Sequence, residues 1–343
     1  MIKNLQALRF IFSFTVMLAH FSYAGISAKS TGASVCFFAI LSGFLLSKVY
    51  GLRLETRKLT KTKYLLRRLV KLYPLHLSCL LVYIVLYIRH LNGTGALALV
   101  PNALLLQSWF PDANIYFSGN SVSWYLSDVL FFLVVFPFLH QVVHRLNARQ
   151  LMATAVTVLA LYIAYMLMLS YDNLNYWLYI FPPVRLIDFT IGMLLWRAVE
   201  LRPSFGKVGW QSPTEALLMA ALVLSIVSFP IHEKWHTAFI HWLVVVPMML
   251  VFFQNDNEGG IITRLLHTTP IQWLGTFTME IFLLHKTVFN VIMLTAIHLD
   301  ISLPYFLMML LCFSAAIATA YCVHRWFVVP TTNWLSSYVE KIP

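Results

Sequence analysis

Arg9 and His20, near the N-terminus, are the first two residues whose types and spacing could support chemistry in an apolar setting. The run from Phe10 to Tyr23 is otherwise largely apolar. In a helix, the eleven residues from Arg9 to His20 make nearly three turns, so the two side chains share a face and lie roughly 16 Å apart along the axis. An arginine at a membrane boundary can extend its guanidinium into water, whereas an imidazole inside hydrocarbon is costly and indicates a functional site. Two interpretations of His20 stay open: a catalytic base, or a histidine that is hydrogen-bonded to a neighbouring helix.

A second group of cations lies where a later helix would enter the membrane. Arg67, Arg68 and Lys71 directly precede Leu72-Tyr73-Pro74, and Arg68 and Lys71 are one helical turn apart. Together with Arg9 they could bind the phosphates of a nucleotide-like ligand, because arginine supplies a fork of donors and lysine a point charge. The alternative is a cytoplasmic anchor that binds anionic lipid head groups.

Further charges lie inside later apolar runs, namely Asp128, Arg185, Asp188, Glu280, His285 and Lys286. Arg185 and Asp188 are spaced i, i+3, so they can pair with one another on one helix, or they can line a polar cavity reached from outside. A carboxylate such as Asp128 or Asp188 could also fix the tautomer of a buried His20. The sequence does not show which carboxylate would do so.

The composition identifies the elements that must position these residues. The chain has 343 residues, of which 60% are hydrophobic and 11% charged, whereas a soluble domain carries about 25% charged residues. The protein is therefore expected to be an all-α integral membrane protein, with one multi-pass domain over residues 1–343 and no fused soluble domain. The net charge of +11 follows membrane topology, so no nucleic-acid partner is expected. The cysteines are expected to be buried free thiols: Cys36, Cys79, Cys312 and Cys322.

About ten apolar runs are long enough to be spanning helices: 8–24, 33–50, 72–90, 123–143, 150–170, 176–197, 213–231, 237–254, 273–297 and 303–328. The first run has no small-residue cleavage site, so it is expected to be a retained helix. Basic residues concentrate between Arg53 and Lys71. This bias predicts that the loop and both termini are cytoplasmic, with Tyr171–Asn175 and His232–His236 outside. Turn signals between Leu91 and Val122 predict an outside loop around the short apolar piece Ala103–Phe110.

Six stretches, in this order, resemble the membrane acyltransferase-3 family: Leu8-Arg9 with His20, Phe37–Phe44, Arg67–Pro74, Ser123–Asp128, Arg185–Gly192 and Phe282–His285. The resemblance covers essentially the whole chain. It implies an enzyme of a bacterial inner membrane that moves an acyl group, such as acetyl, from cytoplasmic acyl-coenzyme A to a hydroxyl of a carbohydrate or glycan on the far side. Lys71 and Asp128 depart from the family's arginine and glutamate but keep the sign of the charge.

The resemblance also implies roles for individual residues. His20 and Asp128 would be catalytic, and Trp124, Arg185, Asp188 and His285 would contact the acceptor. The donor would be held by Arg9, Ser42, Arg67, Arg68 and Lys71. Acetyl-CoA or another acyl-CoA is the expected donor substrate, membrane lipids surround the protein, and no metal is expected. The pantetheine arm of coenzyme A is about 20 Å long, comparable to the depth between Arg9 and His20 on a helix.

Two other functional classes were weighed. His232-Glu233-Lys234-Trp235-His236 has the pattern of zinc proteases, but it follows Pro230 in a short loop and no third ligand follows at a motif distance. A transporter of a glycan, lipid or small anion is the non-enzyme alternative, because intramembrane charges also mark translocation routes. It predicts related halves or broken helices at corresponding positions, and the sequence shows neither.

Overall fold

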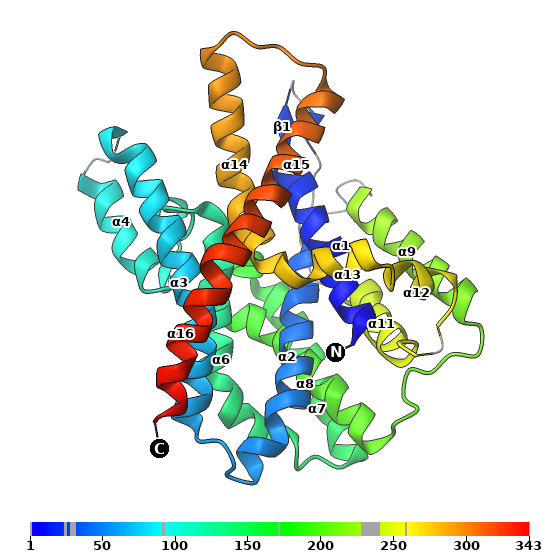
Figure 1. The fold of residues 1–343 in the computed structure, drawn as a ribbon. Helices are drawn as coiled ribbons and strands as arrows, with labels where there is room; N and C mark the ends of the chain where they lie inside the picture. The colour runs from blue at the N-terminus through cyan, green and yellow to red at the C-terminus, as the bar shows by residue number, and fades with distance from the viewer. Residues whose placement is uncertain are drawn as a thin grey trace.

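The computed structural model describes residues 2–23, 26–27, 32–90, 93–170, 172–227, 241–257 and 259–342, and this part of the chain is almost entirely helical (Figure 1). The helices are α1 Lys3–His20, α2 Gly32–Glu55, α3 Lys61–Tyr87, α4 Gly93–Ala103, α5 Ala113–Tyr116, α6 Trp124–Val143, α7 Ala148–Met168, α8 Pro182–Leu201, α9 Gln211–Val227, α11 His241–Gln254, α12 Ile261–Leu266, α13 Thr269–Leu274, α14 Thr278–His298, α15 Tyr305–Val323 and α16 Val329–Glu340. The strands β1 Ser22–Tyr23 and β2 Ile26–Ser27 form a small antiparallel pair after α1.

The all-helical membrane class is confirmed, and seven of the expected spans are long and apolar enough to cross a membrane in the described part of the chain. In the described part seven segments qualify: Gly32–Glu55, Lys61–Tyr87, Ser121–Val143, Ala148–Met168, Asn175–Leu201, Thr269–His298 and Tyr305–Glu340. The three other expected spans correspond to α1 and to α9 and α11, which lie on either side of residues 228–240, outside the described part of the chain. The side on which each terminus lies stays a prediction, and Tyr171 and His232–His236 fall outside the described residues.

The region between Leu91 and Val122 differs from the expected irregular loop. Helix α4 occupies its first part, and Pro101 lies inside that helix. The short helix α5 follows and is capped by Asp112, whose side chain accepts a hydrogen bond from the backbone N–H of Asn114. The turn signals therefore mark the breaks between short helices.

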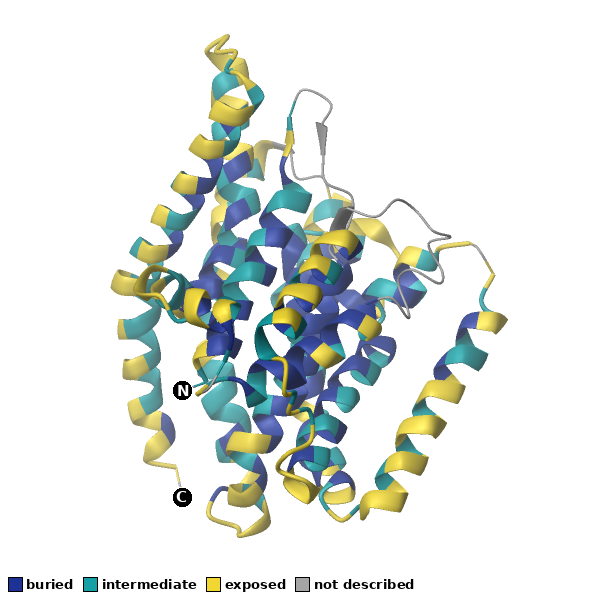
Figure 2. Cartoon of the chain, turned by 90° about the vertical axis from the view of Figure 1, so that its right-hand side faces the viewer, coloured by how far each residue is buried: buried dark blue, intermediate teal, exposed yellow. Residues whose placement is uncertain are grey.

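Helix α2 lies at the centre of the bundle, and its apolar side chains are buried while those of α7 face outward. Of the most apolar window of each helix, 61% is buried in α2 and 11% in α7. Figure 2 shows this contrast between buried central helices and exposed peripheral ones. Outward-facing apolar side chains suit contact with lipid. All four cysteines are free thiols, as expected, and Cys322 is the one that is not fully buried.

Glycines allow α2 and α8 to pack backbone against backbone. A Cβ atom added to Gly43 would collide with the carbonyl oxygen of Phe189, and one added to Gly192 would collide with that of Ile40. The two glycines thus face each other's helix in a reciprocal contact, as small residues do at close helix crossings in membranes. This contact sets the position of α2 relative to α8, and so of the polar residues that both helices carry.

A buried polar network fixes the start of α1. The side-chain amide of Asn4 donates to the Phe252 carbonyl at 2.9 Å and to Thr263 Oγ1 at 3.1 Å. Thr263 Oγ1 donates in turn to Glu215 Oε1 at 2.8 Å, and the backbone N–H of Asn4 donates to Asp256 Oδ1 at 2.7 Å. Because buried polar groups need partners, this network ties α1 to α9, α11 and α12 and holds the helix that carries Arg9 and His20.

Substitution of Gly43 or Gly192 by alanine is expected to separate α2 from α8 and to lower the free energy of unfolding by about 1–3 kcal/mol. The comparison is Gly209→Ala, where nothing lies within 4 Å of the added Cβ. Thermal unfolding of the purified variants in detergent measures the effect. Equal melting temperatures for Gly43→Ala and Gly209→Ala would show that the glycine contact is not needed.

Candidate functional site

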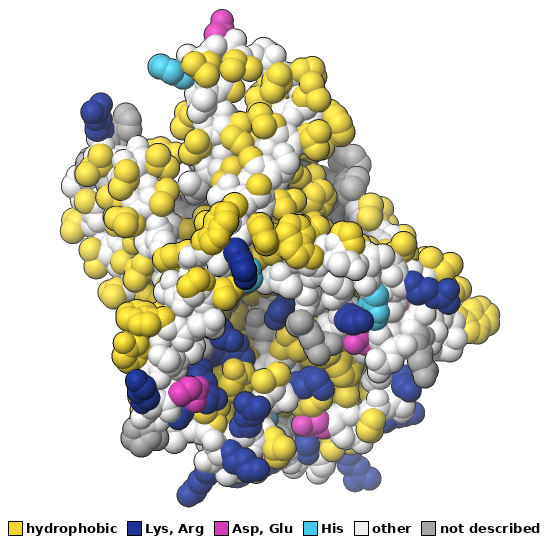
Figure 3. Space-filling model, in the orientation of Figure 1, with side chains coloured by type: hydrophobic (Ala, Val, Ile, Leu, Met, Phe, Trp, Pro, Cys, Tyr) yellow, Lys and Arg dark blue, Asp and Glu magenta, His cyan; other side chains and the backbone are white. Residues whose placement is uncertain are grey.

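Four residues from three different helices line one cavity of about 310 Å³: Arg9 of α1, Ser42 of α2, and Arg68 and Lys71 of α3. These are four of the five residues that the sequence analysis assigned to the donor. The other described lining residues are apolar and none is acidic. Lys and Arg side chains gather over the lower half of the face shown in Figure 3, around a hollow, while the upper half is largely apolar. A cavity with three uncompensated cations is suited to a polyanion.

Helical periodicity explains why these residues meet. Ser42, Leu45, Leu46 and Val49 all line the cavity and follow the i, i+3, i+4, i+7 pattern of one helix face. On α3, Arg68 and Lys71 are one turn apart, and Thr60 caps the helix start by accepting a hydrogen bond from Lys63 N at 3.2 Å.

Arg68 and Ser42 differ in whether their hydrogen-bond donors already have partners within the protein. The Arg68 guanidinium lies over the Tyr50 ring, 4.4 Å from its centre, and its Nε is buried without a hydrogen-bond partner. Ser42 Oγ donates to the Phe38 carbonyl at 2.7 Å. Arg68 therefore retains donor capacity for a ligand.

Arg67, the fifth residue expected to bind the donor, points elsewhere. Its Nε and Nη2 donate to the two carboxylate oxygens of Glu340, at 2.8 and 2.7 Å. It therefore forms a bidentate ion pair with α16 and is not among the residues that line the cavity. Adjacent residues on a helix point about 100° apart, and here the pairing with Glu340 directs Arg67 toward α16 while Arg68 faces the cavity.

A second cavity of about 330 Å³ adjoins the first and shares Arg9, Leu45 and Val49 with it. It brings in a cation that the sequence analysis did not select, Lys48. The Lys48 ammonium lies 4.5 Å from the centre of the Trp196 ring. The sequence signal that could have identified Lys48 is its spacing from Ser42 and Leu45 on α2. Each cavity lies in the size range of small-molecule sites, about 300–1,000 Å³.

His20, at the opposite end of α1 from the cavity, forms a pair with His285 of α14. His285 Nε2 lies 3.1 Å from His20 Nδ1, and His20 Nδ1 also lies 3.0 Å from the Val16 carbonyl. His285 Nδ1 lies 3.0 Å from the Ile281 carbonyl. His285 is fully buried and lies between the Phe282 and Phe289 rings.

The contacts of the two histidines are mutually consistent with one pair of tautomers. A carbonyl can only accept, so His285 Nδ1–H donates to Ile281 and the lone pair of its Nε2 is free to accept. His20 Nδ1–H then donates to Val16 and His285, which leaves the lone pair on His20 Nε2. Both described hydrogen bonds of His20 use Nδ1, so the atom suited to remove a proton is free of them.

The carboxylates expected near His20 are engaged elsewhere. Asp188 forms an ion pair with Arg185 Nη1 at 2.7 Å and accepts a hydrogen bond from Trp242 Nε1 at 2.6 Å. Arg185 also donates to the Leu178 carbonyl at 2.8 Å. Arg185 and Asp188 are buried, so their intrahelical pairing, one of the two interpretations above, is the arrangement present. The imidazole of His285 therefore fills the position beside His20 where a carboxylate was expected.

Asp128 and Trp124 belong to the same buried region. Asp128 is fully buried, and both of its carboxylate oxygens lack a hydrogen-bond partner. Trp124 packs against Tyr179 at a ring separation of 5.0 Å and accepts a hydrogen bond from Ser108 Oγ at its carbonyl. These contacts account for Trp124 as a core residue but leave the Asp128 carboxylate without a partner. The roles expected for Asp128 and Trp124 stay predictions.

Apolar spanning helices around a cationic cavity define a multi-pass membrane protein with a site for an anionic ligand. The acyltransferase 3 family model, described as an acyltransferase domain, matches residues 2–325, so the chain belongs to that family. The chain is 28% identical over 277 residues to the acyltransferase MdmB of Streptomyces mycarofaciens. That alignment covers 74% of this chain and 66%, slightly less than two thirds, of the relative. The comparison with solved structures gave no match.

Replacement of Arg185 by leucine is expected to lower the free energy of unfolding by about 3–5 kcal/mol, because it leaves Asp188 buried without its cation. The matched control is Arg197→Leu, which breaks a half-exposed pair with Glu200 and should cost about 0–1 kcal/mol. Melting temperatures in detergent, with activity measured in parallel, separate the roles. A stable but inactive Arg185→Leu protein would instead place Arg185 in the acceptor site.

Proposed function

We propose that this protein is a transmembrane O-acyltransferase that moves an acetyl group from cytoplasmic acetyl-CoA to a hydroxyl of a carbohydrate or glycan on the extracytoplasmic side. One observation carries the proposal: the continuous helix α1 contributes Arg9 to a cationic cavity and His20 to a histidine pair eleven residues further on. That separation is about 16 Å along the helix. Family membership and the bacterial source of MdmB support a bacterial inner membrane as its location.

At the donor end, the cations of the cavity would hold the phosphates of coenzyme A. Arg68 provides an unpaired guanidinium N–H, and Arg9 and Lys71 add two more positive charges. With the phosphates there, the pantetheine arm can extend along α1, and its length of about 20 Å exceeds the roughly 16 Å to His20. The thioester would then reach the histidine pair without passage of the nucleotide through the membrane.

At the acceptor end, His20 would act as the general base. The acceptor hydroxyl attacks the thioester carbonyl carbon while His20 Nε2 takes the hydroxyl proton, the new C–O bond forms, and the C–S bond breaks. The coenzyme A thiolate leaves and takes that proton back from His20. His285 touches neither substrate in this scheme and acts as a positioning residue, because it accepts from His20 Nδ1–H together with the Val16 carbonyl and so keeps the lone pair of His20 on Nε2.

The route of acyl transfer and the functional class of the protein each have an alternative. Transfer through an acyl-histidine would use the same residue, and direct attack is the route proposed here. Membership of an acyltransferase family favours the enzyme over a transporter, and the His232–His236 motif lies outside the described residues.

Arg68→Ala is expected to weaken acetyl-CoA binding by about 10–100-fold, because a charge-assisted contact contributes roughly 1.5–3 kcal/mol. Arg67→Ala provides the matched control, since its neighbouring guanidinium is paired with Glu340 outside the cavity. Isothermal titration of each purified variant with acetyl-CoA measures both affinities. Equal losses in the two variants would contradict a specific donor cavity and favour general electrostatic attraction.

His20→Ala is expected to lower acyl transfer by about 10²–10⁴-fold while donor affinity stays near that of the wild type. His298→Ala, an exposed histidine at the end of α14, controls for loss of an imidazole. The assay uses proteoliposomes with acetyl-CoA on one side and candidate glycans on the other, and follows release of free coenzyme A and acetylation of the glycan. Wild-type protein that releases no coenzyme A with any glycan would overturn the function, and a fully active His20→Ala protein would overturn its mechanism.

The role of His285 has its own test. His285→Leu removes one of the two acceptors for His20 Nδ1–H, leaving the Val16 carbonyl, and should lower turnover by roughly 10–100-fold. His285→Gln can offer an amide oxygen there and should recover part of the turnover. The readout is kcat at saturating acetyl-CoA. Equal turnover in the two variants would show that His285 only fills space.

A further inference from the structure

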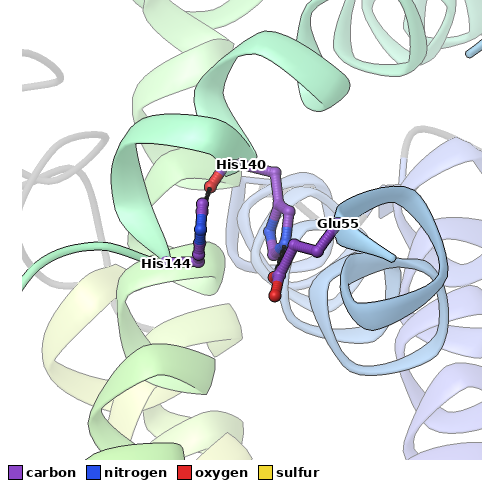
Figure 4. A group of neighbouring side chains, drawn as sticks. All are labelled: Glu55, His140 and His144. Carbon is purple, nitrogen blue, oxygen red and sulfur yellow. Dashed lines mark hydrogen bonds and ion pairs between the residues drawn. The ribbon is translucent and has the colours of Figure 1, made fainter. Parts of the chain in front are cut away.

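A cluster of three metal-ligating side chains lies outside the site described so far, at the ends of α2 and α6. Glu55 is the last residue of α2, His140 lies in the last turn of α6, and His144 follows one turn later (Figure 4). One ligand atom from each residue lies within 4.8 Å of the other two. Glu55 is exposed, His144 half-buried and His140 buried.

We propose that Glu55, His140 and His144 bind one divalent transition-metal ion, with Zn²⁺ as the best match. Two neutral imidazoles and one carboxylate form a donor set that Zn²⁺ accepts, with a water or another ligand in the fourth position. Two histidines at i, i+4 on a helix face the same side, as a chelating pair requires. This proposal is independent of the acyl transfer proposed above.

The local structure prepares at least one of these ligands. His144 Nδ1 lies 2.8 Å from the His140 carbonyl and donates to it, so the lone pair of His144 is on Nε2. The stacked rings of the two histidines have centres 5.3 Å apart. Gly51 makes room on α2, because a Cβ atom there would lie 2.6 Å from His140 Cε1.

His140 Nε2 and Glu55 Oε1 are already in contact, and small movements complete the geometry. They lie 2.7 Å apart, and His140 Nδ1 is buried without a hydrogen-bond partner. Ligand atoms around a tetrahedral Zn²⁺ lie about 2.0–2.2 Å from the ion, and hence roughly 3.5 Å from each other. Rotation of the Glu55 and His144 side chains, which reach the surface, is sufficient to accommodate such an ion.

The ion would connect two helices that form walls of the cationic cavity. Leu46 and Val49 of α2, and Val129 and Leu133 of α6, line that cavity further along the same helices. A bound metal would therefore link the ends of α2 and α6 and stabilise the folded state by binding it alone. We assign the ion a structural role.

The test uses the full-length protein in detergent, stripped of metal with a chelator. Competition with a chromophoric zinc indicator should show one equivalent of Zn²⁺ bound with micromolar or better affinity. Co²⁺ should give the visible spectrum of a tetrahedral site. At an excess of about 100-fold over Kd, Zn²⁺ should raise Tm by roughly 5 °C.

Variants assign the ligands. Removal of a ligand's hydrogen-bond partner lowers metal affinity by roughly 10–100-fold, and removal of a ligand itself, in His144→Gln, should lower Zn²⁺ affinity by more than that. The Tm of metal-free His144→Gln should be unchanged. His298→Gln should bind Zn²⁺ normally. The double variant His232→Gln/His236→Gln tests the other sequence with metal-ligand spacing and should also bind normally. The proposal is overturned if wild-type protein binds no Zn²⁺, if His144→Gln retains full affinity, or if the double variant alone abolishes binding.

Discussion

The structure depends on a single constraint: a polar group that is buried in an apolar interior without a hydrogen-bond partner costs free energy. With 60% hydrophobic residues the chain has few polar side chains to place inside, and most of those it buries are joined to one another. Arg185 and Asp188 form a buried pair that Trp242 completes, and Glu215 accepts from Thr263 at the start of α1. Such closed groups hold helices together. Arg68 Nε differs from them in lying beside a cavity that a ligand can enter, where it has no partner within the protein.

Most of the polar lining of the cationic cavity was predicted, mainly from the family resemblance. Arg9, Ser42, Arg68 and Lys71 were selected from the sequence, and the structure brings all four to one cavity. Arg67 could not be separated from Arg68, because its orientation depends on Glu340, which lies 273 residues away. The number of spanning helices stays a prediction, because seven segments qualify in the described part of the chain and α9 and α11 border residues outside it.

The contact between His20 and His285 could not be predicted from the sequence. His285 was selected as a contact for the acceptor, and a carboxylate was expected beside His20, because carboxylates commonly orient histidines. The structure places the His285 imidazole there instead, across 265 residues of sequence. No local pattern encodes that contact, which follows from the packing of α14 against α1.

The residues of the Phe37–Phe44 stretch have different roles in the structure. Ser42 lines the cavity, Gly43 allows the close contact with α8, and Phe37 stacks on Phe12 with ring centres 3.9 Å apart.

The neutral character of the His285 partner bears on the route proposed for acyl transfer. A carboxylate would supply a countercharge to the imidazolium that forms when His20 takes the acceptor's proton, whereas an imidazole supplies a hydrogen bond and no charge. A charged intermediate in an apolar site is therefore poorly stabilised. The departing coenzyme A thiolate is itself the nearest anion to be expected at that moment, and return of the proton to it removes both charges. This favours direct attack, in which the two proton transfers accompany bond formation and cleavage, over a long-lived acyl-imidazolium that would have to persist beside a neutral neighbour.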